Sequence, residues 1–122
     1  MDIALWIVSG LLAAAYLFAG INKALRPKDK LVETGLAWGE DFSPATIKFI
    51  GVVEILGAIG LILPWLTGIA PVLTPIAATG LVIVQVLAII VHLRRHEAKV
   101  IPMNLVLLLA ALFVAIFRFA AL

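Results

Sequence analysis

The stretch from Phe49 to Val91 most constrains the fold, because its 43 residues contain a single formally charged residue, Glu54. Helix-breaking residues gather near its middle: Pro64, Gly68, Pro71 and Pro75. An apolar run of about 20 residues is long enough to cross the ~30 Å hydrocarbon core as a helix. The stretch therefore predicts two membrane-spanning helices joined by a tight uncharged turn, with one carboxylate at a depth where charge is costly.

The composition also points to a membrane. Of the 122 residues, 65% are hydrophobic and 13% are charged, roughly half the charged share of a typical soluble domain. The net charge of +2 comes from basic residues grouped in two loops, which indicates membrane topology, so we expect no nucleic-acid partner. The chain has no cysteine, which excludes disulfides, thiolate metal sites and covalently attached c-type haem.

Two further apolar runs lie at the ends of the chain, which brings the expected number of spans to four. Asp2 precedes the first run and basic residues follow it, the reverse of a cleavable signal peptide, so we expect the first helix to be retained. The prediction is an all-α fold: one integral membrane domain over 1–122, a four-transmembrane-helix bundle. Its spans are expected at about 3–25, 45–64, 74–93 and 100–121.

The segment between the first two spans is polar, and we expect it to lie on the membrane surface. It runs from Lys28 to Phe42, with Leu31 and Leu36 on a short amphipathic turn and Trp38 at the depth of the headgroups. After it, Ser43 and Pro44 are typical of an N-cap and a first helical residue. The second helix is predicted to end near Pro64. In the fourth, Pro102 falls in the first turn, where its missing N–H costs little.

The distribution of basic residues predicts the orientation. Eight of the nine Lys and Arg residues flank the first and third loops, and only Arg118 lies at the other side. The positive-inside rule then places both charged loops in the cytoplasm and both termini outside. Trp6 and Trp65 would lie at the outer interface and Trp38 at the inner one, which agrees with aromatic residues at both membrane surfaces.

Polar and small residues recur at helical spacing in every span. Residues seven apart lie nearly on one face of a helix. Four helices with one such face each can satisfy these groups only by facing one another, which predicts a bundle with a polar interior. The faces are Ser9, Tyr16 and Lys23; Gly51, Glu54, Gly57 and Ala58; Thr74, Gln85 and His92; and Asn104, Ala111 and Arg118.

Six of these residues are the candidate ligand-binding set: Glu54, Tyr16, Gln85, Lys23, His92 and Asn104. Tyr16, Glu54 and Gln85 lie about two turns, or roughly 10 Å, inside the cytoplasmic boundary and would form one layer. Lys23, His92 and Asn104 would form the mouth of the same cavity. Arg118 and Ser9 would form its outer end.

Each candidate has a structural alternative. We favour a ligand or proton site at Glu54, and the alternative is a protonated acid hydrogen-bonded to Tyr16 or Gln85. For Tyr16 and Gln85 themselves we favour a purely structural interhelical hydrogen bond. Lys23 can approach Glu54, although helix arithmetic leaves that pairing marginal. Lys23 and Arg118 are both expected to be anchors that extend to the headgroups.

A metal site is not expected. His92 and His96 have the i, i+4 spacing that suits a metal ion. At an arginine-rich interface, however, such a pair is more often solvated.

Three segments carry a resemblance to a known family: AGINK at 19–23, IGVVEILGAIGLILP at 50–64, and 88–92 at the end of the third span. Together they resemble the DoxX-like family of small four-helix bacterial membrane proteins. The resemblance implies a four-span bundle in the bacterial inner (cytoplasmic) membrane. It also implies a link to membrane redox systems, because the family takes its name from a subunit associated with a terminal quinol oxidase and with thiosulfate:quinone oxidoreductase. A distant animal relative of the family resembles a receptor-assembly chaperone. The polar residues of this chain that match the family pattern are Lys23 and Glu54.

The leading functional hypothesis is a non-catalytic accessory protein. Its polar cavity around Glu54 would bind a quinone or a lipid in support of a membrane redox system. The chain offers no ligands for an electron carrier, so we expect no cofactor other than a quinone held as a ligand. The expected partners are the lipid bilayer and other membrane redox proteins, and a homo-oligomer is left open.

Three alternatives belong to other classes. The first is a membrane-protein assembly factor that docks through the glycine-rich face of the second helix and the segment around Trp38. The second is a proton-coupled small-molecule transporter, which is less favoured because small multidrug exporters carry their acid on the first helix. The third is an enzyme using Glu54 for proton transfer, which lacks a well-placed second acid or base.

Overall fold

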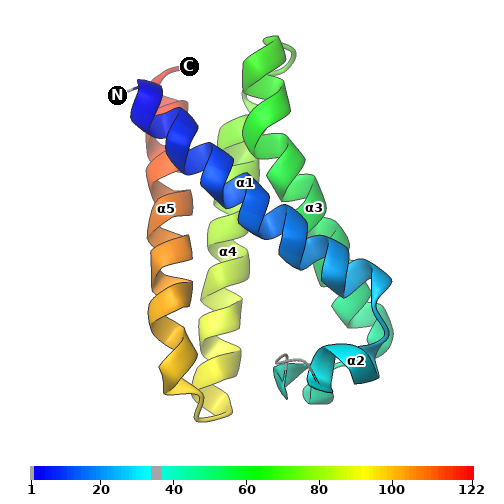
Figure 1. The fold of residues 1–122 in the computed structure, drawn as a ribbon. Coiled ribbons are helices and arrows are strands. Elements are labelled where there is room, and N and C mark those ends of the chain that lie inside the picture. The colour runs from blue at the N-terminus through cyan, green and yellow to red at the C-terminus, as the bar shows by residue number, and fades with distance from the viewer. Residues whose placement is uncertain (1, 34–36) are drawn as a thin grey trace.

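The computed structural model describes residues 2–33 and 37–122, and in these residues it contains helices and turns but no strand (Figure 1). Four of the helical segments are long and apolar enough to cross a membrane. The predicted all-α fold with four spans is therefore confirmed. The elements in chain order are α1 (Asp2–Leu25), α2 (Lys28–Glu33), η1 (Ala37–Asp41), α3 (Pro44–Thr67), α4 (Leu73–Arg94), η2 (Ala98–Val100) and α5 (Ile101–Ala120).

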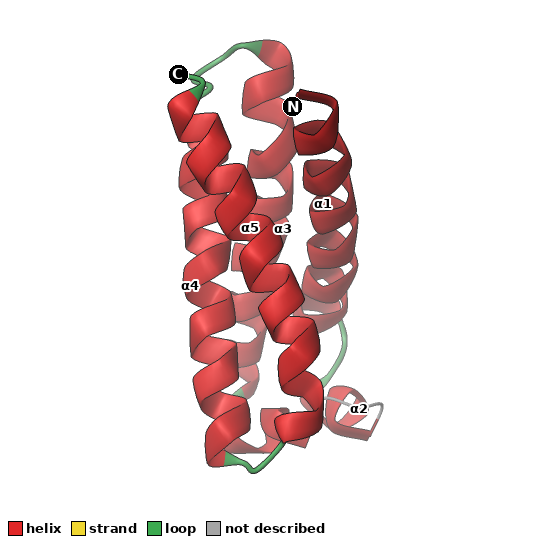
Figure 2. Cartoon of the chain, turned by 90° about the vertical axis from the view of Figure 1, so that its left-hand side faces the viewer, coloured by secondary structure: helices red, strands yellow, loops and turns green. Residues whose placement is uncertain are grey.

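The long helices form a bundle in which α1 packs against α3, α3 against α4, α4 against α5, and α5 against α1. In Figure 1, α1 runs obliquely across the bundle: its C-terminal part lies on α3, and its N-terminus lies beside the C-terminal end of α5. Both chain termini and the α3–α4 turn lie at one end, which we call the terminal end. The helix α2 and the α4–α5 turn lie at the other, here called the loop end (Figures 1 and 2).

The interior contains the faces predicted from the seven-residue spacing. Its apolar part is small and mixed in size: Leu12, Tyr16, Ala58, Leu61, Ala78, Leu81, Ala111, Val114 and Ala115. The buried polar and charged side chains are Ser9, Glu54, Thr74, Gln85 and Arg118. The prediction of a bundle with a polar interior is confirmed. The large hydrophobic side chains on the exposed surface are mainly leucine and isoleucine, with valine and phenylalanine, which suits contact with lipid tails.

Two helices begin as their sequences predict. Ser43 is the N-cap of α3, and its Oγ accepts a hydrogen bond of 3.2 Å from the Thr46 N–H. Pro44 is the first helical residue. The fourth span opens with the short turn η2, and Pro102 lies in the first turn of α5, where no intrahelical N–H bond is lost.

The second span does not end at Pro64, contrary to the prediction, but continues to Thr67. Proline has no N–H, so the carbonyl of Gly60 loses the partner that a helix would provide. The Thr74 hydroxyl of α4 donates to that carbonyl at 2.8 Å instead. Hydroxyl groups on neighbouring helices allow proline inside membrane helices in this way. The helix then ends at Gly68, whose φ of 73° is left-handed and whose N–H donates to the Pro64 carbonyl.

Replacing Thr74 by Val is expected to lower the free energy of unfolding by about 1 kcal/mol, because the Gly60 carbonyl is then buried without a donor. Unfolding in mixed detergent micelles, followed by circular dichroism, measures the loss. Thr79→Val is the matched control: the Thr79 hydroxyl donates to Pro75 in its own helix at 2.8 Å, where the carbonyl keeps other partners. Equal losses in the two variants would show that the interhelical bond is not the cause.

The connection between α1 and α3 forms the predicted interfacial segment as α2 and η1. Leu31 is buried, as expected for the apolar side of the amphipathic turn, whereas Leu36 lies outside the described residues. The Trp38 ring meets Phe42 edge-on with 5.5 Å between centroids. The same ring lies 5.5 Å from Nζ of Lys23, so the segment covers the loop end of α1.

Candidate functional site

The helices α1 and α3 touch through two glycines. A Cβ atom on Gly20 would lie 2.6 Å from the Gly51 carbonyl oxygen, and one on Gly51 would lie 2.7 Å from the Gly20 carbonyl oxygen. Only glycine permits such an approach of two helix backbones. The contact places the last turn of α1, which carries Lys23, beside the turn of α3 that carries Glu54.

Lys23 and Glu54 form a buried ion pair. Nζ of Lys23 donates to Oε1 of Glu54 at 2.5 Å, and the two side chains are 13% and 3% exposed. Each charge compensates the other for the loss of water. The pairing that helix arithmetic left marginal is therefore present. The alternative in which Glu54 is hydrogen-bonded to Tyr16 or Gln85 is wrong.

Tyr16 and Gln85 form the second polar pair. Nε2 of Gln85 donates to the Tyr16 hydroxyl at 2.5 Å, and both side chains are buried. The bond joins α1 to α4 across the bundle, which confirms the predicted interhelical hydrogen bond. Oε1 of Gln85 is buried and has no hydrogen-bond partner in the described ranges 2–33 and 37–122. Lys23, Glu54, Tyr16 and Gln85 thus form two separate pairs. The three residues expected in one layer, Tyr16, Glu54 and Gln85, are therefore not joined in one hydrogen-bonded network.

His92 and Asn104 do not bond to Lys23 at the expected mouth. Nδ1 of His92 lies 3.0 Å from Oε1 of Glu97 in the α4–α5 turn. Asn104 is partly exposed and has no side-chain hydrogen bond within the part of the chain that the structure describes. In that same part, no three His, Asp or Glu side chains come together as metal ligands.

The α4–α5 turn is linked by charge to the interfacial segment. Arg95 Nη1 donates to Asp41 of η1 at 2.7 Å, and Arg95 Nε lies 3.4 Å from Glu97. The hydrogen bond with His92, together with Arg95, lowers the pKa of Glu97. The hydrogen bond to Asp41 raises the pKa of Arg95. The polar residues of this turn serve to hold the loop end together.

Arg118 is buried inside the terminal end, so it is not the freely extended anchor that the sequence predicts. Its side chain is 2% exposed, and its guanidinium carbon lies 5.0 Å from the Trp6 ring centroid and 4.4 Å from that of Trp65. Lys23 likewise turns inward, to Glu54. The position of Arg118 seven residues after Ala111, on the polar face of the fourth span, is the sequence signal that its side chain faces inward.

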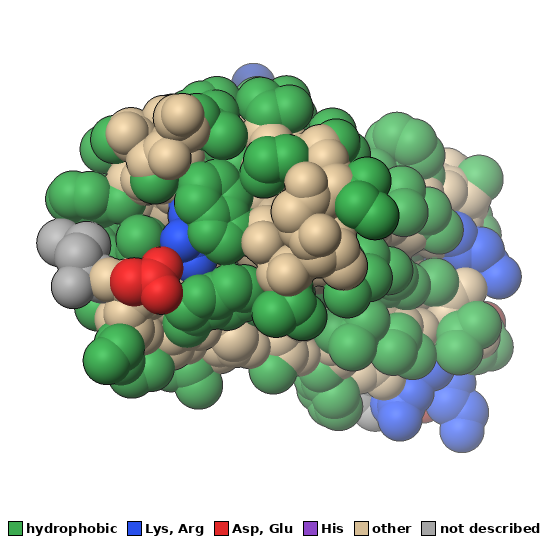
Figure 3. All heavy atoms as spheres, turned by 90° about the horizontal axis from the view of Figure 1, so that it is seen from above, with side chains coloured by type: hydrophobic (Ala, Val, Ile, Leu, Met, Phe, Trp, Pro, Cys, Tyr) green, Lys and Arg blue, Asp and Glu red, His purple; other side chains and the backbone are tan. Residues whose placement is uncertain are grey.

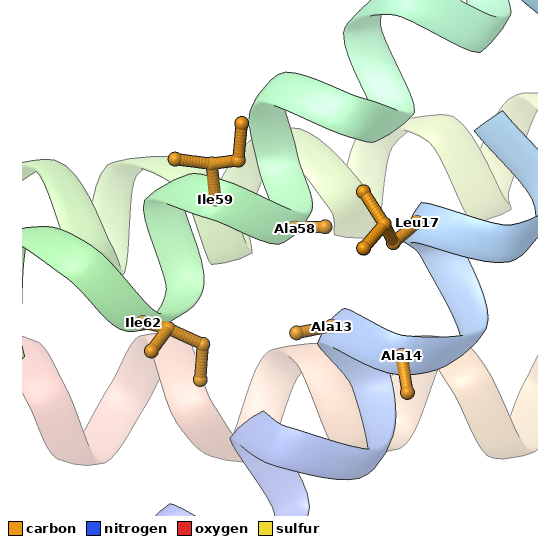
Figure 4. Close-up of a pocket in the computed structure, with 6 residues that line it drawn as sticks. All are labelled: Ala13, Ala14, Leu17, Ala58, Ile59 and Ile62. Atoms are coloured by element: carbon orange, nitrogen blue, oxygen red, sulfur yellow. The ribbon is translucent and has the colours of Figure 1, made fainter. Parts of the chain in front are cut away.

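Two apolar clefts open on the surface of the bundle. The first, of about 210 Å³, lies between α1 and α3, where the small alanine side chains leave a gap that larger side chains border (Figure 4). The second, of about 400 Å³, lies between α3 and α4. Neither is lined by any of the six candidate residues, so neither is the polar cavity expected around Glu54. The first cleft, which we call the α1–α3 groove, is lined by Ala13, Ala14, Leu17, Ala58, Ile59 and Ile62.

The α1–α3 groove and the ion pair follow one another along the same helix seam. Ala58 comes four residues after Glu54 on α3, which is roughly 6 Å of helix length. On α1, Leu17 precedes the Gly20 contact by three residues. The seam is therefore closed by glycines beside the ion pair and open to lipid on the terminal side of it.

The comparisons with known proteins concern most of the chain. The model of the DoxX-like family matches residues 7–114. No curated protein and no solved structure matches the chain. The matched range includes the ion pair, the Tyr16–Gln85 bond and both clefts, whereas Trp6 and Arg118 lie just beyond its two ends. With four helices fit to span a membrane and a family match over nearly its whole length, the chain belongs to the DoxX-like family of membrane proteins.

Proposed function

We propose that this protein is an accessory protein of the bacterial cytoplasmic membrane that binds a quinone or a lipid in support of a membrane redox system. The polar head of the ligand binds at Lys23 and Glu54, and its tail lies in the α1–α3 groove. The observation that carries the proposal is the seam itself, in which a lipid-facing apolar groove leads toward a buried ion pair. The redox part rests on the family resemblance.

The ion pair can recognise a head that both donates and accepts hydrogen bonds. An ammonium group has three N–H donors and a carboxylate has two oxygens, whereas the pair uses one of each. A quinone carbonyl could accept from Lys23, and a quinol hydroxyl could donate to Glu54. A lipid headgroup with an amine and a phosphate would also match. The Trp38 ring over Lys23 supplies a flat apolar surface beside the head.

The apolar part of the ligand matches the groove. The six side chains that line it carry no polar group, and the alanines leave room for the first part of an isoprenoid or acyl chain. Because the groove opens toward the lipid, the rest of a long tail would stay in the membrane. The ligand tail could thus enter the groove from the membrane without passing through the interior of the bundle.

The proposed orientation has the loop end in the cytoplasm and both termini outside. Figure 1 places the two basic loops at one end of the bundle and the two termini at the other. Eight of the nine Lys and Arg residues belong to the loop end, and the positive-inside rule assigns that end to the cytoplasm.

Native mass spectrometry of protein extracted gently from its own membrane tests the proposal. Wild type should carry a quinone or a lipid. Ala14→Phe should lose it, because the new ring fills the groove that Ala14 lines. Ala15→Phe is the matched control, since Ala15 is also exposed on α1 but does not line the groove. The double variant Lys23→Met/Glu54→Gln should lose the ligand while keeping the groove.

The outcome that would end this proposal is wild-type protein with no small molecule, or equal ligand content in Ala14→Phe and Ala15→Phe. A membrane protein found in place of a ligand would favour the second candidate, an assembly factor. That candidate is supported by the second cleft, because Gly57, Gly60 and Gly80 line it and small residues let a partner helix approach closely. A transporter is less supported, since Glu54 is already neutralised by Lys23.

A further inference from the structure

Arg118 is a buried cation whose charge is only partly compensated. Its side chain is 2% exposed. Among the described residues it forms one ion pair, at 3.2 Å with Asp2, whose own side chain is 72% exposed. Seen from the terminal end, a basic area lies directly beside an acidic area at the left, and further basic areas lie at the right-hand side of the view (Figure 3). A buried charge is costly unless it is fully hydrogen-bonded, so the remaining N–H groups of Arg118 need partners.

Those N–H groups lie on one edge of the guanidinium. Nη1 donates to Asp2, whereas Nε and Nη2 are buried and have no hydrogen-bond partner among the described residues. Nε and Nη2 together form the side of the guanidinium fork that binds two oxygens of one carboxylate or phosphate. The unused donors are thus arranged for a bidentate oxyanion.

Two tryptophans contact the guanidinium of Arg118 without accepting hydrogen bonds from its free N–H groups. The guanidinium carbon lies over the rings of Trp6 and Trp65, 5.0 and 4.4 Å from their centroids. Such cation–π contacts stabilise the charge but do not replace the missing hydrogen-bond acceptors. Ser9 lies one turn after Trp6 on α1, and its Oγ is also buried without a partner. A hydroxyl can add a further donor to an oxyanion.

We propose that Arg118, in contact with the rings of Trp6 and Trp65, is a second binding site that takes an oxyanion, either the phosphate of an anionic lipid headgroup or free phosphate. Tryptophans gather at the depth of the headgroups, so lipid phosphates are present at the level of this site. Asp2 bonds to Nη1, so it leaves the Nε and Nη2 edge to the ligand. Trp6 lies near the start of α1 and Arg118 in the last turn of α5, both at the terminal end, whereas Lys23 lies in the last turn of α1. The site is therefore distinct from the Lys23–Glu54 pair and does not depend on the function proposed above.

Tryptophan fluorescence tests the site in a Trp38→Phe host, in which only Trp6 and Trp65 remain to report. One arm titrates inorganic phosphate into protein in neutral detergent at fixed ionic strength. The other uses nanodiscs of phosphatidylcholine with increasing phosphatidylglycerol. We expect a saturable change in at least one arm, weakened about tenfold or more in Arg118→Lys, which keeps the charge but loses the fork. Arg94→Lys, exposed at the loop end of α4, should bind as the host does.

Each outcome decides the proposal. A fluorescence response to inorganic phosphate identifies a site for free oxyanions, and a response to phosphatidylglycerol alone identifies a site for lipid headgroups. Either response supports the proposed site. No saturable change in either arm, or equal affinity in Arg118→Lys, overturns it. If Arg118→Lys does not fold, Asp2→Asn gives the answer, because removing the neighbouring carboxylate, whose negative charge repels an oxyanion, should tighten binding several-fold. Unchanged or weaker affinity in Asp2→Asn would contradict the site.

Discussion

Replacing Lys23 by Met will lower the free energy of unfolding by about 3–5 kcal/mol, the largest loss we expect from a single side chain in this protein. Glu54 is 3% exposed and bonded to Lys23 at 2.5 Å, so the variant leaves a carboxylate buried beside apolar groups. Equilibrium unfolding in mixed micelles, with circular dichroism and Trp38 fluorescence as independent probes, measures the loss.

The double variant Lys23→Met/Glu54→Gln should recover most of that stability, because replacing both members of a buried ion pair is often nearly neutral. Lys48→Met is the control, since Lys48 is also basic and near the loop end but exposed, and it should change stability by less than about 0.5 kcal/mol. A double variant as unstable as Lys23→Met alone would mean that the charge of Glu54 is not the source of the cost.

The fold could be predicted from the sequence because its main determinants are local. Hydropathy and length give the four spans, and the seven-residue spacing of Ser9, Tyr16 and Lys23 gives the inward face of α1, as the burial of these residues confirms. Glycines that pack helices together are also visible as small residues on the polar face. Each of these patterns can be read from a single helix, so the neighbouring helices need not be known.

The features that could not be predicted from the sequence depend on contacts between two helices. The continuation of α3 beyond Pro64 depends on a hydroxyl of Thr74 on the next helix. The Lys23–Glu54 bond depends on how closely α1 approaches α3, which the Gly20–Gly51 contact sets. The charges along α1 alone could not decide whether Lys23 extends to the headgroups as an anchor or forms an ion pair.

The clefts and the burial of Arg118 depend on helix tilt, which the sequence does not encode in a simple pattern. The α1–α3 groove opens where α1 leaves α3 and crosses toward α5 (Figure 1). The same crossing brings Trp6 onto Arg118 at the terminal end. Helix tilt follows from packing against neighbours rather than from span length. One oblique helix therefore produces both of the proposed binding regions.

Gly51→Ala will destabilise the protein by about 3 kcal/mol, at the upper end of the usual cost of an added methylene in a packed core. Its Cβ would lie 2.7 Å from both the Ala24 nitrogen and the Gly20 carbonyl oxygen. Those are backbone atoms, so relief requires α1 to move away from α3. The displacement would also lengthen the Lys23–Glu54 bond. Unfolding in mixed micelles measures the loss of stability, and the Trp38 emission reports on the displacement of Lys23.

Two other glycines form a graded control series. A Cβ on Gly57 would meet only side-chain atoms of Leu81, the nearest at 2.8 Å, and a side chain can rotate, so Gly57→Ala should cost about 1 kcal/mol. A Cβ on Gly80 would meet nothing within 4 Å, so Gly80→Ala should be neutral or stabilising by up to about 1 kcal/mol. The order Gly51, Gly57, Gly80 follows what each methyl group meets: backbone, side chain or open space. Equal effects at the three positions would show that helix propensity, and not the α1–α3 contact, decides these substitutions, and the seam would then lose its role in positioning Lys23 beside Glu54.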